Sequence, residues 1–169
     1  HIAKEVKEAF DKGKPVLALE STIITHGMPY PDNGELAREV ENLVRKEGVT
    51  PATIAVIEGI IHIGLDPLTL ERLAQSGKQS YKISRKDLGS ALGKKLTGGT
   101  TVAATTFLAG LFGIKVFATG GIGGVHRGVS ETLDISADLK AISESPVVVV
   151  CAGAKSILDV PKTLEALET

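Results

Sequence analysis

The run of four valines from Val147 to Val150, directly after Pro146, constrains the fold more than any other stretch of the sequence. Consecutive β-branched residues are typical of a strand buried on both faces of a sheet, whereas a half-buried strand alternates apolar and polar residues. We therefore predict a central strand here, in a sheet whose two faces are covered by helices. The small residues of CAGA suit a tight turn after it, and Ser156 is predicted to cap a helix over residues 157–168.

The rest of the chain alternates strand and helix patterns. The segment TIAVIEGIIHIG predicts a hairpin that turns at Glu58 and Gly59. Asp32 or Asn33 is predicted to cap the helix over residues 35–48, and TGGTT at 97–101 is predicted to open the apolar helix that begins at residue 102. Further strands are expected at 16–19, 80–84 and 114–118, and helices at 1–14, 35–48, 68–77 and 102–113. This alternation predicts one α/β domain over residues 1–169, with three α/β/α layers and a mainly parallel, mixed sheet.

The composition excludes several classes of protein. Nineteen basic residues against twenty acidic ones give a net charge of -1, so we expect no general attraction to nucleic acid or to an acidic membrane. The longest apolar stretches contain Thr, Gly and Lys and are too short for a membrane span. The one cysteine, Cys151, excludes an internal disulfide and agrees with a reducing compartment. We therefore expect an intracellular, cytoplasmic protein.

The segment from His126 to Ser156 contains the strongest candidates for chemistry. Lys155 follows the predicted valine strand and precedes a predicted helix start, where desolvation and the helix dipole both favour a neutral, nucleophilic amine. Asp134 and Asp138 lie four residues apart, which suits an oxygen-rich site for a hard cation or a hydroxylated ligand. A solvated loop lysine and two carboxylates at a helix start are the simpler interpretations, and both stay open.

Glu20 and Lys82 are further candidates, because Glu20 directly follows the predicted strand at 16–19 and Lys82 lies in the predicted strand at 80–84. Burial at the end of a strand would raise the pKa of Glu20 and make it a usable proton donor. Lys82 could bind an anion, although a solvated edge lysine would give the same pattern. The stretch TGGIGGVHRG lacks the third glycine of a dinucleotide fingerprint, and His26 and His126 lack the spacing of a zinc site. The ends of strands in such a sheet are nevertheless expected to form a ligand crevice.

Six segments together resemble one family. These are ALESTIITHGMPYP, the strand with Lys82, GGTTVAATT, FATGGIGGVHRG, ETLDISADL and VCAGAKSILD, which occur in this order along the chain. They are similar to the pseudouridine-5′-phosphate glycosidases, also called the indigoidine synthase A-like family. The resemblance implies an α/β/α enzyme that reversibly cleaves pseudouridine 5′-phosphate into uracil and ribose 5-phosphate. It also implies a metal-dependent C-glycosidase, commonly a homotrimer with Mn²⁺, in nucleoside catabolism.

The resemblance assigns roles to particular positions. Glu20 matches the proton donor of the family and Lys155 matches the lysine that forms a Schiff base. Asp134 matches the metal position. The implied substrate contacts are Lys82, Val102, Ser136, Ala137 and Asp138. Family chains usually run on well beyond the position of Thr169, so this sequence is expected to be the N-terminal part of such a chain, with part of the uracil pocket elsewhere.

Two other functions stay compatible with these residues. A lysine-dependent aldolase or lyase acting on another sugar phosphate would also need a Schiff-base lysine and a phosphate site. A non-catalytic module that binds a nucleotide or a sugar phosphate would need only the pocket. Release of uracil from pseudouridine 5′-phosphate distinguishes the C-glycosidase from both.

Overall fold

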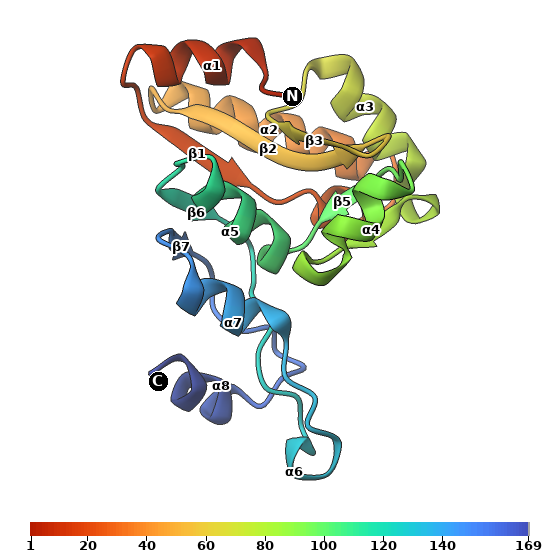
Figure 1. The fold of residues 1–169 in the computed structure, drawn as a ribbon, viewed down its shortest axis with the longest axis vertical. Coiled ribbons are helices and arrows are strands. Elements are labelled where there is room, and N and C mark those ends of the chain that lie inside the picture. Colours follow the sequence, from red (N-terminus) through yellow and green to blue (C-terminus); the bar gives the residue numbers. More distant parts are fainter. Residues whose placement is uncertain (169) are drawn as a thin grey trace.

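A computed structural model describes residues 1–168 and shows helices packed around one seven-stranded sheet (Figure 1). The strand order is β4-β5-β2-β1-β6-β7, and β3 pairs with β2 off this path. The strands are β1 (Val16–Leu19), β2 (Thr50–Ile57), β3 (Ile60–Ile63), β4 (Tyr81–Ile83), β5 (Gly98–Thr100), β6 (Val116–Ala118) and β7 (Val148–Val150). The helices are α1 (Lys4–Asp11), α2 (Asp32–Lys46), α3 (Pro67–Ser76), α4 (Leu88–Gly93), α5 (Val102–Leu111), α6 (Val129–Thr132), α7 (Ala137–Glu144) and α8 (Val160–Leu167).

The sheet is mixed and mostly parallel, as the alternation of strands and helices predicts. β1 pairs in parallel with β2 and β6, and β6 in parallel with β7, so the carboxyl ends of these strands point the same way. β2 pairs antiparallel with β3 and β5. The predicted hairpin is confirmed, and it turns at Glu58 and Gly59, which both have positive φ as a tight hairpin turn requires.

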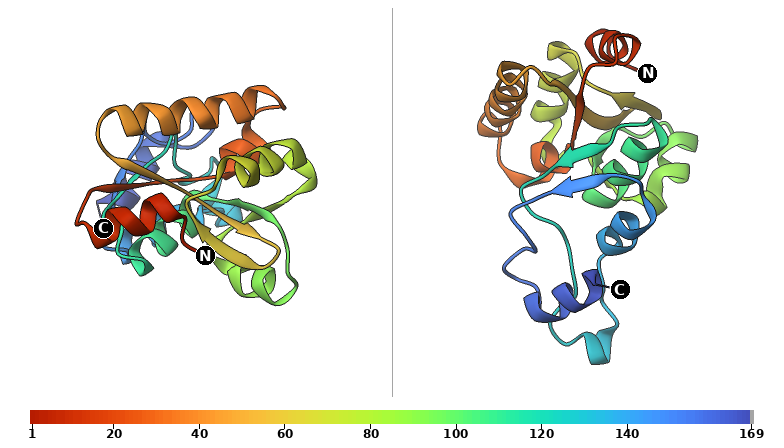
Figure 2. Two further views of the ribbon diagram at one scale, coloured as in Figure 1. Left: turned by 90° about the horizontal axis from the view of Figure 1, so that it is seen from above. Right: turned by 90° about the vertical axis from the view of Figure 1, so that its left-hand side faces the viewer.

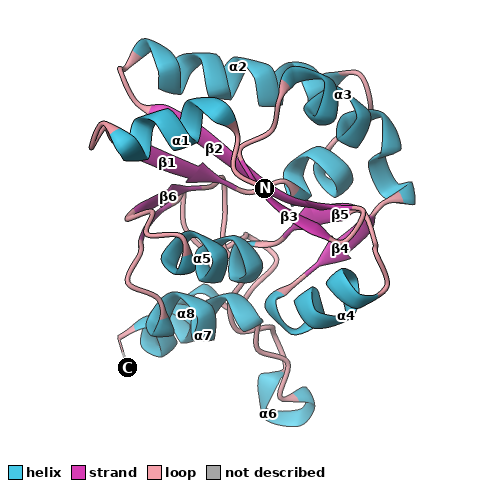
Figure 3. Ribbon diagram, turned by 45° about the horizontal axis from the view of Figure 1, so that its top comes forward, coloured by secondary structure: helices cyan, strands magenta, loops and turns pink. Residues whose placement is uncertain are grey.

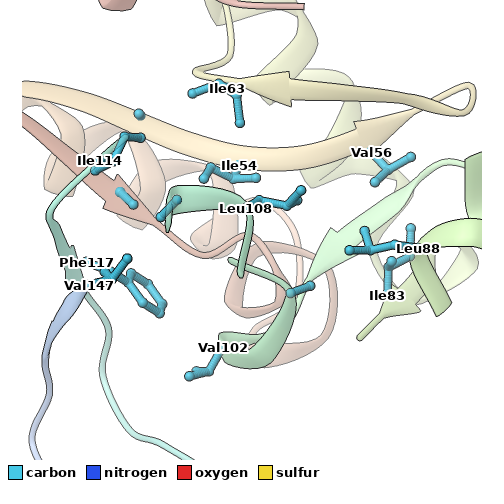
Figure 4. Close-up of a cluster of buried hydrophobic side chains, with 14 of the residues drawn as sticks. Ile54, Val56, Ile63, Ile83, Leu88, Val102, Leu108, Ile114, Phe117 and Val147 are labelled. Atoms are coloured by element: carbon cyan, nitrogen blue, oxygen red, sulfur yellow. The ribbon is translucent and has the colours of Figure 1, made fainter. Parts of the chain in front are cut away.

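Helices cover both faces of the sheet and give the predicted three layers. α2 lies on one face, and α1 and α5 lie on the other (Figures 2 and 3). α5 is apolar nearly all round because it lies between the sheet and α7, and Thr101 caps it by accepting a hydrogen bond from the Ala104 amide. Its residues Val102 and Leu108 join Phe117 of β6 and Ile54 of β2 in the core (Figure 4).

The valine strand is where the structure most clearly differs from the prediction. β7 is the last strand in the sheet order, and not a central one. Val147 is buried, but the Val148 and Val150 side chains are 64% and 55% exposed. The prediction was wrong because β-branched composition reports a preference for extended backbone, while burial depends on which neighbours the rest of the fold supplies.

One strand was not predicted, and two predicted helix caps were wrong. Gly98–Thr100 forms the strand β5, and Thr101 opens α5 as expected. α8 begins at Val160 and is capped by Asp159, so Ser156 lies in the preceding turn. α2 begins at Asp32 with Pro31 at its N-cap position, so neither Asp32 nor Asn33 caps it, and the Asn33 amide donates to the Ile24 and Ala74 carbonyls. The two wrong caps concern the first residues of helices, whose exact starting positions are difficult to predict from sequence.

Two segments connect the sheet to the smaller helices. The chain after β6 and the chain after β7 run side by side away from the sheet towards α6 and α8 (Figure 1). Their backbones are bonded to each other, since the Ile122 amide donates to Gly153 and the Lys155 amide donates to Ile122. The glycine-rich loop therefore holds the segment that carries Lys155. Within residues 1–168, no helix is long and apolar enough to cross a lipid bilayer.

Candidate functional site

A cleft with a volume of about 300 Å³ lies beside the carboxyl end of β1. Glu20 follows β1, Lys82 lies in β4, and Lys155 follows β7, yet all three line this one cleft. The other predicted site residues that line it are Val102, Ser136, Ala137 and Asp138. His126 lines it as well, whereas His26 lines a different hollow, with Met28 and Tyr30. Segments far apart in the sequence thus bring two amines and two carboxylates to one place.

Glu20 is the carboxylate whose ionisation the fold changes most clearly. Burial raises the pKa of Glu20 above its ordinary value, and this outweighs the hydrogen bond from Thr119 and the positive charge of Lys155, which act in the opposite direction. The Thr119 hydroxyl donates to Oε1 of Glu20. A raised pKa makes the carboxyl group a better proton donor than an exposed glutamate, which is the direction that general acid catalysis requires.

Lys155 lies on the exposed rim of the cleft, in the turn between β7 and α8. Its backbone is fixed, because its amide donates to the Ile122 carbonyl and its carbonyl accepts from the Leu158 amide. The side chain projects from a fixed backbone towards the same cleft as Glu20, and its charge reaches that carboxylate. An amine placed in this way can attack a carbon atom bound in the cleft.

Lys82 and the start of α5 form another part of the lining. Lys82 is exposed on β4, and Ser84, Thr101 and Val102 line the cleft with it. One ammonium group beside two hydroxyl groups and a helix N-terminus suits an anion such as phosphate. Val102 is the first residue of α5 and its side chain is buried, so a ligand would meet its backbone.

Both carboxylate oxygens of Asp138 are bonded to backbone amides, so this residue has a structural role in addition to any contact with substrate. Its side chain is 8% exposed, Oδ1 accepts from the Ala103 amide at 2.9 Å, and Oδ2 accepts from the Gly123 amide at 2.8 Å. A Cβ atom on Gly123 would lie 2.7 Å from Oδ2 of Asp138 and 2.2 Å from the Ser136 hydroxyl, so only glycine fits there. Asp138 therefore links the glycine-rich loop to α5, and each oxygen still has a second lone pair.

Ser136 and Ala137 begin α7 on the wall of the cleft. The Ser136 hydroxyl accepts from the Asp138 amide at 3.2 Å and caps the helix. Of the simpler interpretations, a carboxylate in the first turn is confirmed for Asp138, whereas Asp134 as the helix cap was wrong. Ala137 is exposed. A role for either residue towards a ligand stays a prediction.

Asp134, the predicted metal residue, is exposed and lies outside the cleft lining. Its Oδ2 is 3.7 Å from Nδ1 of His126, and its side chain is 61% exposed. The 168 described residues contain no group of three or more His, Cys, Asp or Glu side chains placed to hold a metal ion. This donor set fits a hydrated hard cation bound through one carboxylate, and it does not fit an ion enclosed by protein ligands.

Two residues of the site were missed in the sequence. Thr119 contacts Glu20 across 99 positions of sequence, which no local pattern reveals. Thr22 lines the cleft, and its hydroxyl oxygen is buried with no hydrogen-bond partner in the described part of the chain. The only available signal was that each residue lies within three positions of the carboxyl end of a predicted strand.

Comparison with known proteins places the chain among close relatives. The profile of the family described as indigoidine synthase A like protein matches residues 5–169. A Clostridium botulinum protein named pseudouridine-5′-phosphate glycosidase is 58% identical over 168 residues, which cover 99% of this chain and 55% of that protein. A Sorangium cellulosum protein of the same name is also 58% identical over 168 residues, 99% of this chain and 53% of its own. The chain thus spans about half the length of the curated relatives it matches.

Solved structures agree with the sequence comparison. The crystal structure of the prealnumycin C-glycosynthase AlnA in complex with ribulose 5-phosphate has a TM-score of 0.89 and 43% identity, covering 99% of this chain and 54% of that one. An indigoidine synthase A-like protein from Thermotoga maritima has a TM-score of 0.85 and 39% identity, covering 93% of this chain and 52% of its own. The six sequence segments, the mixed α/β sheet and the family match agree, and the chain belongs to the indigoidine synthase A-like family.

Proposed function

We propose that this chain carries the catalytic lysine and proton donor of a pseudouridine-5′-phosphate glycosidase, which cleaves its substrate reversibly into uracil and ribose 5-phosphate. The observation that carries the proposal is the convergence of Glu20, Lys82 and Lys155 on one cleft from three separate strands. Its volume of about 300 Å³ is at the lower end of the range of small-molecule sites, which is ~300–1,000 Å³. The names of relatives that are 58% identical support the same substrate.

A C–C glycosidic bond calls for covalent catalysis, because its leaving atom is a carbon without the lone pair that an acid protonates in an ordinary glycoside. In our proposal the Lys155 amine bonds to C1′ while the C1′–O4′ bond breaks, and Glu20 gives its proton to O4′. The resulting secondary ammonium returns a proton to Glu20, which delivers it to C5 of the base. The nitrogen lone pair then forms a C=N bond as the C1′–C5 bond breaks and its electron pair leaves with uracil. Water hydrolyses the iminium and releases ribose 5-phosphate and the free lysine.

The remaining residues bind and orient the substrate in this scheme. Lys82, with the hydroxyl groups of Ser84 and Thr101, is assigned to the 5′-phosphate. Asp138 and Ser136 hold the wall that the sugar hydroxyl groups would contact. Asp134 would bind a hydrated Mn²⁺, which supplies positive charge to orient oxygen ligands. Manganese and a homotrimer are predictions from the family resemblance.

Borohydride trapping tests the covalent step directly. Reduction in the presence of ribose 5-phosphate should add one pentose phosphate to the peptide that contains Lys155. Lys155→Arg should abolish this labelling, because arginine keeps the positive charge and loses the nucleophile. Lys140→Arg, on the exposed side of α7, is the matched control and should label normally. Labelling at Lys82, or none at Lys155 when the wild-type protein turns over, would contradict the assignment.

Uracil release from pseudouridine 5′-phosphate tests the substrate, and the Clostridium botulinum relative serves as positive control. The similarity to a C-glycosynthase favours a second candidate, in which a pentose 5-phosphate is joined to a different carbon acceptor. Both candidates share the imine at Lys155, so trapping alone does not separate them. Because this chain spans about half the length of its curated relatives, the two candidates are separated on a chain of their full length. In that protein, trapping with no uracil released, and no pseudouridine 5′-phosphate formed from uracil and ribose 5-phosphate, would favour the second candidate.

A further inference from the structure

Glu20 is shared by two neighbouring hollows, and its partner Thr119 belongs to only one of them. Glu20 lines both the candidate cleft and an apolar cavity of about 290 Å³ between α2 and the sheet. Thr119 lines the apolar cavity and not the cleft. The hydroxyl group of Thr119 therefore reaches Oε1 of Glu20 from the apolar cavity, which neither Lys155 nor Lys82 lines.

We propose that Thr119 is a positioning residue that holds Oε1 of Glu20 as a hydrogen-bond acceptor, so that Oε2 carries the transferable proton and faces the cleft. This inference rests on the proposed function, because it specifies how the proton donor of that reaction is oriented. An oxygen that accepts a hydroxyl hydrogen is a poor place for the carboxyl proton, since two hydrogen atoms would then compete for one oxygen. The geometry leaves Oε2 as the oxygen for proton transfer.

The backbone of Thr119 also ties Glu20 to the segment that carries Lys155. The Thr119 amide donates to the Val150 carbonyl of β7, and the next residue, Gly120, accepts from the Ala152 amide. Thr119 thus contacts the residue after β1 through its side chain and the chain before Lys155 through its backbone. One residue thereby fixes the proton donor relative to the strand that delivers the nucleophile.

Every charged group that faces Glu20 belongs to the cleft. Lys155 and Lys82 lower its pKa and Asp138 raises it, while burial raises it more than any other influence. The hydrogen bond from Thr119 is the largest influence that lowers it. Removal of the hydroxyl group should therefore raise the pKa of Glu20 further. It should also leave the carboxyl group of Glu20 free to rotate, so that either oxygen can carry the proton.

Thr119→Val tests the proposal because valine keeps the shape and removes the hydroxyl group. We expect kcat to fall about threefold to tenfold, the loss that corresponds to one hydrogen bond to an uncharged carboxyl group, with KM little changed. The limb of the pH–rate profile that reports Glu20 should move to higher pH. Carboxyl ¹³C NMR on glutamate-labelled protein should show the same rise in the pKa of Glu20 without any need for activity. Thr119→Ser should restore kcat and pKa towards wild type.

Thr106→Val is the matched control, because Thr106 is buried and its hydroxyl group bonds only within α5, to the Val102 carbonyl. It should leave the pKa of Glu20 unchanged. An unchanged pH profile and Glu20 pKa in Thr119→Val would overturn the proposal, as would a serine variant that behaves like valine. If the proposed function itself fails, wild-type protein neither traps ribose 5-phosphate nor releases uracil, whereas the NMR result for Thr119 still stands.

Discussion

Asp138 provides the sharpest test of how this site is built, because both of its oxygens are committed to backbone amides. Asp138→Asn keeps the size of the side chain but turns one oxygen into an NH₂ group. That group would face an amide of Ala103 or Gly123 that now lies 2.9 or 2.8 Å from a carboxylate oxygen. Two donors cannot bond to each other, so one buried amide loses its partner.

The size of the effect follows from these contacts. A hydrogen bond to a charged acceptor contributes about 1.5–3 kcal/mol, and an orphaned buried amide costs about 1–3 kcal/mol. Because the two quantities partly describe the same loss, we expect the free energy of unfolding to fall by about 2–4 kcal/mol. At a urea m-value of about 2 kcal/mol per M, the midpoint should fall by about 1–2 M.

Urea unfolding followed by far-UV circular dichroism measures this change, since the chain has no tryptophan for fluorescence. Asp134→Asn is the matched control, because Asp134 is exposed and the change should cost less than about 0.5 kcal/mol. If Asp138→Asn unfolds at the same midpoint as wild type and only ligand binding is lost, Asp138 is a substrate contact and not a link between α5 and the glycine-rich loop.

Three further predictions concern single groups. Thr22→Val should raise the free energy of unfolding by about 1 kcal/mol, because a buried hydroxyl group without a partner is removed; a loss of stability would mean that this hydroxyl group is bonded after all. Burial raises the pKa of Glu20 above its ordinary 4.5, so its contribution to stability is present at low pH and is lost as the pH rises through the folded-state pKa. Glu20→Gln should therefore gain stability relative to wild type as the pH rises above 4.5, and a stability difference that does not change with pH would refute this. Chelation should remove uracil release, with Mn²⁺ or Mg²⁺ restoring it better than Zn²⁺, and Mn²⁺ binding by Asp134→Ala equal to that of wild type would place the metal elsewhere.

The strands and helices that were predicted correctly are those with a strong local signal. β1 follows from VLAL, and the β2–β3 hairpin follows from two apolar runs on either side of a Glu-Gly turn. β5 was missed because glycine has low strand propensity. The structure shows why glycine is present: a Cβ atom on Gly98 would lie 2.1 Å from the Tyr81 carbonyl oxygen, in the neighbouring strand. The close approach of β4 and β5 depends on tertiary structure, so the strand propensity of single residues does not predict it.

The sequence predicted those site residues that directly follow a strand. Glu20 and Lys155 were chosen because they follow strands, and the parallel pairing of β1, β6 and β7 brings those ends together. The hydrogen bond between Thr119 and Glu20 could not be predicted, since it depends on the order of strands within the sheet. The double link made by Asp138 likewise depends on how α7 packs on α5.

The exposed valines of β7 lead to a last prediction about association. Val148 and Val150 lie on the same face of the outermost strand, and among residues 1–168 β7 pairs only with β6. An uncovered apolar strand with a free edge is a template for pairing with another chain. We therefore expect the 169-residue chain to be poorly soluble and to self-associate as its concentration rises.

The variant Val148→Lys/Val150→Lys should keep the protein monomeric at concentrations where wild type associates, because charged side chains oppose strand pairing at an edge. Leu43→Lys is the matched control: Leu43 is similarly exposed but lies on α2, so association should persist. Sedimentation velocity over a hundredfold range of concentration measures all three proteins. A wild-type chain that stays monomeric throughout would show that exposed β-branched residues on this strand do not drive association. Equal rescue by Leu43→Lys would show that net charge, and not the β7 edge, controls it, since both changes add positive charge but only one alters the strand.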